Sequence, residues 1–203
     1  KKMNIVKSLL LGSLLCASSS SYAVLIGFEP NYQLVNLGSQ ASVDIVVSDL
    51  GGAEIGGFDF STSWDDSILA LSDITFGTAL GDTDPFAFET LLGSTLGTAS
   101  VDLFEVSLLF DFSGLQNGID DVVLATLTFD TLNAGISSLD LTGGMIPRGG
   151  FLSDSNGLLL ATTASSGEIE VVAAVAVPAP MSILLLGIGF IAMRFRKVIG
   201  IRS

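Results

Sequence analysis

The sequence predicts an all-β domain, built as a β-sandwich or jelly roll, and three observations support this. Apolar and polar residues alternate with a two-residue period in several segments, which is typical of strands buried on one face. Glycine pairs and Asn-Gly pairs separate these segments and mark turns. Long stretches with a 3.6-residue period are missing, so substantial helices are not expected. Many short strands between frequent turns indicate packed sheets.

Four segments carry the clearest strand pattern, and each is expected to turn one set of side chains toward the core. In chain order these sets are Val43, Ile45 and Val47; Phe58, Phe60, Thr62 and Trp64; Phe104, Val106, Leu108, Phe110 and Phe112; and Val123, Ala125, Leu127 and Phe129. Polar residues such as Asp59, Glu105 and Asp111 alternate with them and are expected to face solvent. Shorter strands are predicted at 33–37, 139–141 and 168–172. One helical turn is expected after Trp64, capped by Asp65 or Asp66, and residues 78–100 are the least regular part.

The N-terminal residues have the pattern of a secretory signal. Lys1, Lys2 and Lys7 precede a short apolar run, and the small-x-small tripeptide 21–23 follows it. This combination predicts a signal peptide over residues 1–23, cleaved between Ala23 and Val24. The apolar run is too short to cross about 30 Å of hydrocarbon as a helix.

The C-terminal residues 178–203 form a second hydrophobic segment that ends in basic residues. Residues 181–193 are almost wholly apolar, and Arg194, Arg196 and Lys197 follow. The plain interpretation is a single hydrophobic helix that anchors the chain in a membrane. The basic cluster then stays in the cytoplasm and the central domain, residues 24–177, lies outside.

The tail also resembles a known sorting signal. Val177, Pro178, Ala179 and Pro180, followed by the apolar segment and the basic end, are similar to the PEP-CTERM signal, in which Pro-Glu-Pro precedes a hydrophobic helix. Here Ala179 stands where that family favours Glu. The resemblance implies processing by an exosortase, a membrane protease-transpeptidase. It also implies initial anchoring in the membrane and a final place at the cell surface or in an extracellular matrix.

The charge of the central domain limits its partners. All 21 acidic residues lie between Glu29 and Glu170, where Arg148 is the one basic residue. Nucleic acid is excluded as a partner because its phosphates require a basic surface, and anionic lipid would repel the domain. The chain has no histidine, and its one cysteine, Cys16, lies in the predicted signal peptide. Zinc sites of Cys and His and Ser-His-Asp or Cys-His catalytic groups are therefore not expected, and neither are disulfides.

The central domain resembles a cohesin domain. The resemblance rests on residues 41–47 (ASVDIVV), residues 55–60 (IGGFDF) and residues 64–69 (WDDSIL), with Trp64 in place of the family's Tyr and Asp66 in place of its Pro. Residues 123–129 and 167–171 are similar to two later cohesin strands, whereas 78–100 match nothing. The resemblance implies a nine-stranded jelly-roll sandwich with a non-catalytic binding role, such as binding a dockerin-like protein, and a fold related to carbohydrate-binding modules.

Two groups of residues suggest further chemistry. The aromatic residues of the predicted strands, Phe58, Phe60, Trp64, Phe104, Phe110 and Phe112, could stack on sugars, but strand periodicity favours a place in the core. Asp82 and Asp84, and Asp120 and Asp121, lie in predicted loops and could ligate calcium, although neither pair has EF-hand spacing and solvated loop acids are the simpler interpretation.

Three functions follow from these observations. The leading one is a non-enzymatic, exported module that binds protein or polysaccharide. The alternatives are a structural matrix protein whose acidic surface takes up calcium, and a glycoside hydrolase with paired carboxylates.

Overall fold

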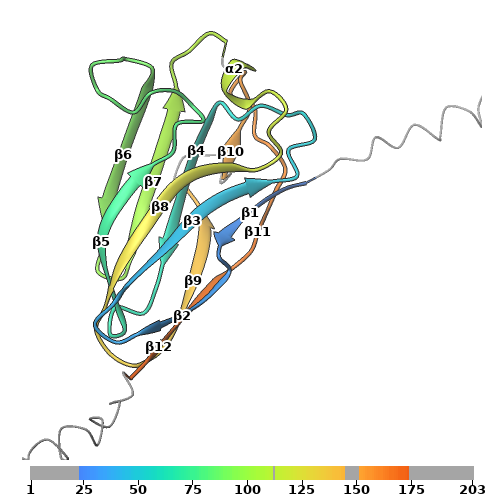
Figure 1. Ribbon diagram of the computed structural model, residues 1–203. Coiled ribbons are helices and arrows are strands. Elements are labelled where there is room, and N and C mark those ends of the chain that lie inside the picture. The colour runs from blue at the N-terminus through green and yellow to red at the C-terminus, as the bar shows by residue number, and fades with distance from the viewer. Residues whose placement is uncertain (1–22, 112, 145–150, 174–203) are drawn as a thin grey trace, which may run out of the picture. The chain divides into compact units, whose positions relative to one another are not determined.

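The computed structural model describes residues 23–111, 113–144 and 151–173, and in them twelve strands form two sheets. The strands are β1 (Val24–Glu29), β2 (Tyr32–Asn36), β3 (Gln40–Ser48), β4 (Gly57–Ser63), β5 (Leu69–Phe76), β6 (Thr90–Leu96), β7 (Ser100–Ser107), β8 (Val122–Thr131), β9 (Gly135–Gly143), β10 (Leu152–Ser153), β11 (Thr162–Ala164) and β12 (Gly167–Val172). A four-residue helix, α2 (Ser113–Gln116), precedes β8 (Figure 1). The predicted all-β sandwich is confirmed.

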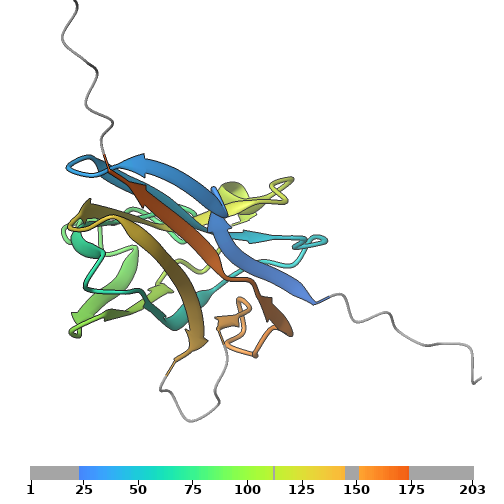
Figure 2. The ribbon, with the colours of Figure 1, turned by 90° about the horizontal axis from the view of Figure 1, so that it is seen from below.

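Most consecutive strands alternate between the two sheets, as in a jelly roll, whereas β6 and β7, and β9 and β10, lie in the same sheet. The five-stranded sheet has the order β11-β1-β3-β8-β5, and the seven-stranded sheet has the order β2-β12-β9-β4-β7-β6, with β10 also paired to β4. The chain enters the first sheet with β1 and passes to the second with β2. Both of these strands pair in parallel with strands from the end of the domain, β11 and β12. Figure 2 shows β12 lying between β2 and β9.

The apolar faces predicted for β3 and β4 form the centre of the core. Val43, Ile45 and Val47 are at most 1% exposed, and Phe58 and Phe60 are at most 3% exposed. Trp64 follows β4 and is 8% exposed. Its indole packs edge-on against Phe129 with ring centroids 5.3 Å apart, and its Nε1–H donates to the carbonyl oxygen of Leu69 at 3.1 Å. Because the ring and its polar N–H are both satisfied inside the protein, Trp64 is a core residue.

The predicted face of β8 holds for Ala125, Leu127 and Phe129 but is wrong for Val123. Val123 is 39% exposed, whereas its neighbours Val122 and Leu124 are buried. The alternation changes because β3 pairs Ile45 with Ala125 but Val46 with Val123, which leaves Leu124 as an extra residue. A β-bulge of this kind turns the preceding side chains to the opposite face.

The predicted face of β7 is wrong throughout the strand. Val101, Leu103 and Glu105 are fully buried, while Phe104 is 39% exposed and Val106 is 45% exposed. The strand ends at Ser107, so Leu108 and Phe110 lie beyond it and are exposed. The residues that decide the register are Val101 and Leu103. Residues 101–106 carry apolar side chains on both faces of the strand, Val101 and Leu103 on one and Phe104 and Val106 on the other. Packing against the opposite sheet buries Val101 and Leu103.

The remaining local predictions have mixed outcomes. The helical turn after Trp64 is confirmed: the carbonyl oxygen of Asp65 accepts from the backbone N–H of Leu69 at 2.9 Å, and its side chain accepts from the N–H of Ser67 at 2.9 Å. The short strands at 139–141 and 168–172 are confirmed within β9 and β12, and the strand predicted at 33–37 is confirmed as β2, which ends one residue earlier, at Asn36. The irregular segment 78–100 contains a full strand, β6. The strands β1, β5, β10 and β11 had no counterpart among the predicted elements.

The chain divides after Ala173 into two units, and the described residues all belong to the first. Within that described part, no helix has the length and apolar character needed to cross a membrane. The predicted hydrophobic helix of residues 178–203 and residues 1–22 of the predicted signal peptide lie outside the described residues.

Candidate functional site

The outward-facing surface of the seven-stranded sheet is the candidate functional site, and it is called the outer face below. Side chains alternate across each strand, so one residue in two points away from the core. On β9, for example, Ser138 and Asp140 are exposed while Leu139 is buried. The outer face comprises Tyr32 and Leu34 on β2; Glu168 and Glu170 on β12; Ile136, Ser138, Asp140 and Thr142 on β9; Asp59, Ser61 and Ser63 on β4; Asp102, Phe104 and Val106 on β7; and Leu91, Gly93 and Thr95 on β6.

The middle of the outer face carries carboxylates and hydroxyl groups, several of them bonded to one another. The hydroxyl group of Ser61 donates to Asp102, one strand away. Asp140 accepts from the hydroxyl of Ser166 at 2.8 Å. At the β2 edge of the outer face, the Tyr32 hydroxyl donates to Glu170 at 2.5 Å. This hydrogen bond raises the pKa of Tyr32. These bonds hold acceptor groups in place on a sheet, which is a more rigid support than a loop.

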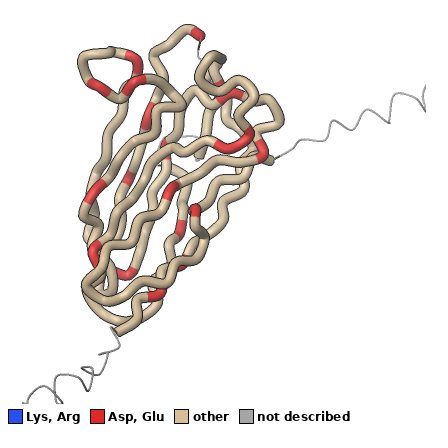
Figure 3. The backbone as a smooth tube through the Cα atoms, viewed as in Figure 1, with Lys and Arg blue, Asp and Glu red and all other residues tan. Residues whose placement is uncertain are grey.

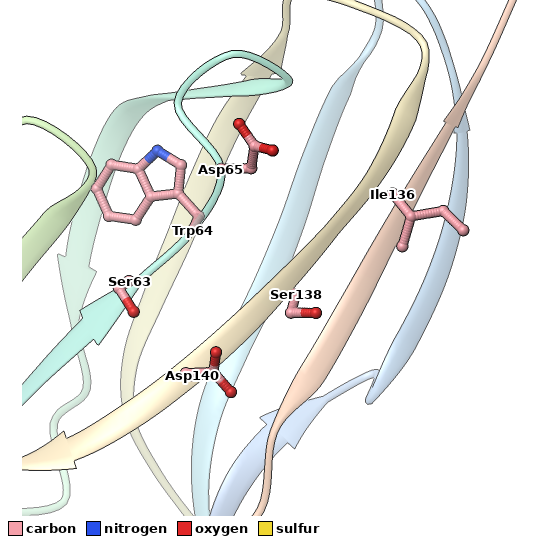
Figure 4. Close-up of a pocket in the computed structure, with 6 residues that line it drawn as sticks. All are labelled: Ser63, Trp64, Asp65, Ile136, Ser138 and Asp140. Atoms are coloured by element: carbon pink, nitrogen blue, oxygen red, sulfur yellow. The ribbon is translucent and has the colours of Figure 1, made fainter.

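A shallow hollow of about 290 Å³, the β4–β9 hollow, lies where β4 ends beside β9. Its lining residues are Ser63, Trp64, Asp65, Ile136, Ser138 and Asp140, which Figure 4 shows as sticks. The hydroxyl of Ser137 accepts from the backbone N–H of Asp65 at 2.9 Å and so ties the end of β4 to β9. Hydrogen bonds from Ser67 hold the pKa of Asp65 below its ordinary value, which keeps this carboxyl group ionised.

The β6–β7 end of the outer face is apolar. Leu91 is 58% exposed and lies opposite Val106, and Phe104 lies opposite Gly93. The Phe104 ring covers Gly93 so closely that a Cβ atom there would lie 2.7 Å from its Cε1 atom. An aromatic ring over a glycine stabilises a cross-strand pair. This apolar end was missed from the sequence, because the inverted face of β7 hid it.

Three phenylalanines extend the apolar end beyond the sheet. Phe86 and Phe88 lie in the loop before β6 and are 84% and 75% exposed, and Phe110 follows β7 and is fully exposed. The two loops are neighbours, because the N–H of Leu108 donates to the carbonyl oxygen of Glu89 at 2.7 Å.

The six aromatic residues considered as a sugar platform do not gather on one surface. Phe58, Phe60 and Trp64 are in the core, as strand periodicity favours. Phe104 is on the outer face and Phe110 is in a loop. Phe112 lies outside the described residues.

The carboxylates considered for calcium lie in loops. Asp82 and Asp84 precede β6, where the side chain of Asp82 accepts from the N–H of Asp84 at 2.9 Å. Asp120 and Asp121 are exposed before β8. Among the described residues, no three carboxylate, Cys or His side chains come together in a group suited to a metal ion.

Negative charge is spread over the whole described surface. All 21 acidic residues are described, and they are distributed along both sheets and the loops, with no Lys or Arg among the described residues (Figure 3). Arg148 lies outside the described residues. A cationic partner surface therefore meets a favourable potential anywhere on this domain.

The predicted processing residues fall mainly outside the described residues. Val177, Pro178, Ala179 and Pro180, and the basic Arg194, Arg196 and Lys197, all lie there. At the other end, Ala23 is exposed and Val24 is the buried first residue of β1, with its N–H donating to the carbonyl oxygen of Ala161 at 2.8 Å.

Comparison with solved structures identifies the architecture. The sixth cohesin of scaffoldin B from Acetivibrio cellulolyticus matches 74% of this chain and 100% of its own, with 16% identity and a TM-score of 0.54. The seventh type I cohesin of the scaffoldin ScaB from Pseudobacteroides cellulosolvens matches 78% of this chain and 97% of its own, with 15% identity and a TM-score of 0.54. The fold is cohesin-like. A non-cellulosomal cohesin from Archaeoglobus fulgidus is also similar, at 14% identity and a TM-score of 0.51.

The cohesin-like fold agrees with the resemblance in the sequence, although the strand number differs. The described residues form twelve strands where the resemblance implies nine. The two- and three-residue strands β10 and β11 are among the additional ones, and the first stretch of the domain is divided between the sheets as β1 and β2. No protein-family model matches the sequence, and no curated protein matches it.

Proposed function

We propose that this chain is an exported, non-enzymatic module that binds a protein partner through the outer face. The observation that carries the proposal is the combination, on one sheet of a cohesin-like fold, of ordered carboxylates with the exposed apolar side chains of Leu91, Phe104 and Val106. Apolar anchors surrounded by polar groups are typical of protein-binding surfaces. Cohesins of this fold have been solved in complex with dockerins, in Acetivibrio cellulolyticus and in Clostridium thermocellum. A dockerin-like partner is therefore the first candidate.

The distribution of carboxyl groups favours binding over catalysis. A glycoside hydrolase needs a carboxyl group of raised pKa next to a second carboxylate in an accessible cleft. Glu105 has a raised pKa, but it is fully buried on the inward face of β7. The β4–β9 hollow is lined instead by Asp65 and Asp140. These two requirements of a hydrolase are thus met in different places.

Export and sorting complete the proposal. The predicted cleavage between Ala23 and Val24 would begin the mature chain at the first residue of β1, so the whole first strand would be kept. The tail from Val177 to the basic residues would be recognised by an exosortase, which would place the domain at the cell surface or in a matrix. Mass spectrometry of the mature protein tests both sites, and an N-terminus other than Val24 contradicts the first.

Binding is tested with the purified full chain, held in mild detergent and immobilised, against a matrix extract of its own host. Each captured protein is then measured against two variants. Phe104→Ser removes an outer-face anchor, and Val123→Ser is a matched control, because both side chains are 39% exposed and Val123 lies on the other sheet. A protein lost with Phe104→Ser and kept with Val123→Ser supports the proposal. Capture of polysaccharide alone, or equal loss with both variants, contradicts it.

A further inference from the structure

We propose that the free edge of β6 accepts an extended segment of a protein partner as an added strand. The proposal concerns the backbone groups at the open side of β6, whereas the proposed function uses side chains of the outer face, among them Leu91 of the same strand. The inference therefore goes beyond that function, and each can fail without the other.

Half of the backbone groups of β6 point away from its partner strand. One backbone hydrogen bond lies at each end of the β6–β7 ladder. The N–H of Gly97 donates to the carbonyl oxygen of Ser100, and the N–H of Leu108 donates to the carbonyl oxygen of Glu89, each at 2.7 Å. In an antiparallel pair the bonded residues alternate, so residues 91, 93 and 95 bond to β7. The N–H and C=O groups of Leu92 and Ser94 are therefore directed to the open side, and no other described strand pairs with β6 there.

The edge of β6 lacks the features that usually prevent strand addition. Natural edge strands are protected by charges, prolines, bulges or shortness. β6 is seven residues long, contains no charged residue or proline, and pairs with β7 in unbroken register. The other edges are better protected. β5 is interrupted between Leu71 and Asp73, β11 has three residues, and β2 has five and follows Pro30.

A hollow beside this edge would receive side chains of an added strand. It measures about 330 Å³ and lies between β5 and the end of β6; it is called the β5–β6 hollow. Leu69 and Leu71 of β5, Leu96 of β6 and the Trp64 indole line it. Leu96 is 65% exposed. An apolar side chain of the added strand would cover Leu96 and complete the core at the side where the two sheets lie open.

Charge specifies the partner. Asp66 lines the β5–β6 hollow at one end of the edge, and Asp82 and Glu89 flank the start of β6 at the other, where the side chain of Glu89 accepts from the N–H of Asp82 at 2.9 Å. With no Lys or Arg among the described residues, these carboxylates attract a segment with basic ends. A second copy of this domain carries the same negative charge and is repelled. The partner is an extended, alternating apolar segment of about seven residues, or about 20 Å, with Lys or Arg at both ends.

The test uses a synthetic peptide that alternates valine and threonine over seven residues between terminal lysines, titrated against the purified full chain. Binding is followed by peptide anisotropy and by amide hydrogen exchange of β6. We expect binding, with exchange slowed at Leu92 and Ser94. Binding should fall at least tenfold when the central peptide residue is proline, and also when the lysines are replaced by glutamates.

Two variants of the protein complete the test. Ser94→Pro removes an edge N–H without removing a bond to β7, and Ser94→Lys adds a repulsive charge should the proline variant not fold. Either is expected to abolish binding, while Val123→Ser, at an exposed position on the other sheet, leaves it unchanged. Absence of binding at millimolar peptide overturns the proposal. Equal binding by the proline peptide overturns it as well. So does the finding that the chain forms a dimer and that Ser94→Pro dissociates it, because the occupant of the edge would then be a second copy of the chain.

Discussion

The side chain of Gln116 binds both backbone groups of Ile55, a residue distant in sequence. Its Oε1 atom accepts from the N–H of Ile55 at 2.7 Å, and its Nε2 atom donates to the carbonyl oxygen of Ile55 at 2.8 Å. Nε2 also donates to the carbonyl oxygen of Ala79 at 3.0 Å. Gln116 is only 5% exposed, so helix α2 is held to two loops by one buried amide.

Replacing Gln116 by leucine should lower the free energy of unfolding by about 2 to 4 kcal/mol, because three backbone groups would lose their partners. Urea unfolding followed by the fluorescence of Trp64, the one tryptophan of the chain, measures this. Leu115→Ala in the same helix is the control and should cost less than about 1 kcal/mol. Equal losses in the two variants would show that the amide has no special role.

Glu105 should make the protein less stable as the pH rises through neutrality. Its side chain is fully buried, neither carboxyl oxygen has a hydrogen-bond partner, and burial raises its pKa from 4.5 to about 7. Between pH 4.5 and about pH 7, the Glu105 carboxyl group is protonated in the folded protein and ionised in the unfolded chain. The resulting stabilisation is full below about pH 4.5 and is lost as the pH rises through 7, with a maximum of about 3 kcal/mol.

Comparison of the wild type with Glu105→Met isolates this contribution from the repulsion among the other carboxylates. Methionine is similar in length and carries no charge at any pH. Urea unfolding at pH 5 and pH 8 should show a smaller loss of stability in Glu105→Met than in the wild type. Asp121→Asn, in an exposed loop, should keep the wild-type difference. A variant Glu105→Met with an unchanged difference would refute the role of Glu105.

Gly77 should not tolerate any side chain. It follows β5 at the bulge of β8, where its N–H donates to the carbonyl oxygen of Leu124 at 2.8 Å. A Cβ atom would lie 2.0 Å from the carbonyl oxygen of Val123, which is backbone and cannot move freely. Gly77→Ala should therefore destabilise the fold by more than about 2 kcal/mol. Gly114→Ala, where a Cβ meets no atom within 4 Å, should be neutral in the same thermal melts.

Calcium should stabilise the domain no more than magnesium does at equal ionic strength. Salt screens the mutual repulsion of the 21 carboxylates, so both cations should raise the melting temperature similarly. A specific calcium site would add a concentration-dependent rise. A larger shift in millimolar calcium chloride than in matched magnesium chloride would favour the calcium-binding matrix protein instead.

The positions of seven of the twelve described strands were predictable from the sequence, but the faces of two of these seven were not. In β4 the apolar residues occupy one parity only, and in β3 all of them except Val46 do, so the buried face follows from the pattern. In β7, Val101 and Leu103 compete with Phe104 and Val106, and the sum of local hydrophobicity favours the wrong set. In β8, the bulge at Leu124 is visible only in the pairing with β3, and the Leu124 carbonyl oxygen there accepts from the N–H of Gly77.

The candidate sites were less predictable than the fold. The outer face was hidden by the inverted face of β7, and no local motif distinguishes β6 from the loop before it. That strand became visible through its pairing with β7. The burial of Glu105 is not expected for a charged residue. Nothing near Gln116 in the sequence indicates that its amide binds the distant residue Ile55.

By itself, the sequence determined that the domain is all-β, where its central strands lie, that Asp65 or Asp66 caps a turn and that the surface is acidic. These properties depend on neighbouring residues or on composition. Only the tertiary structure decided which side of β7 meets the core, which strand remains an open edge and which carboxyl group is buried. Those outcomes depend on the pairing of strands far apart in the chain, and the free energy of burying one face against the opposite sheet outweighs the preference of any single residue.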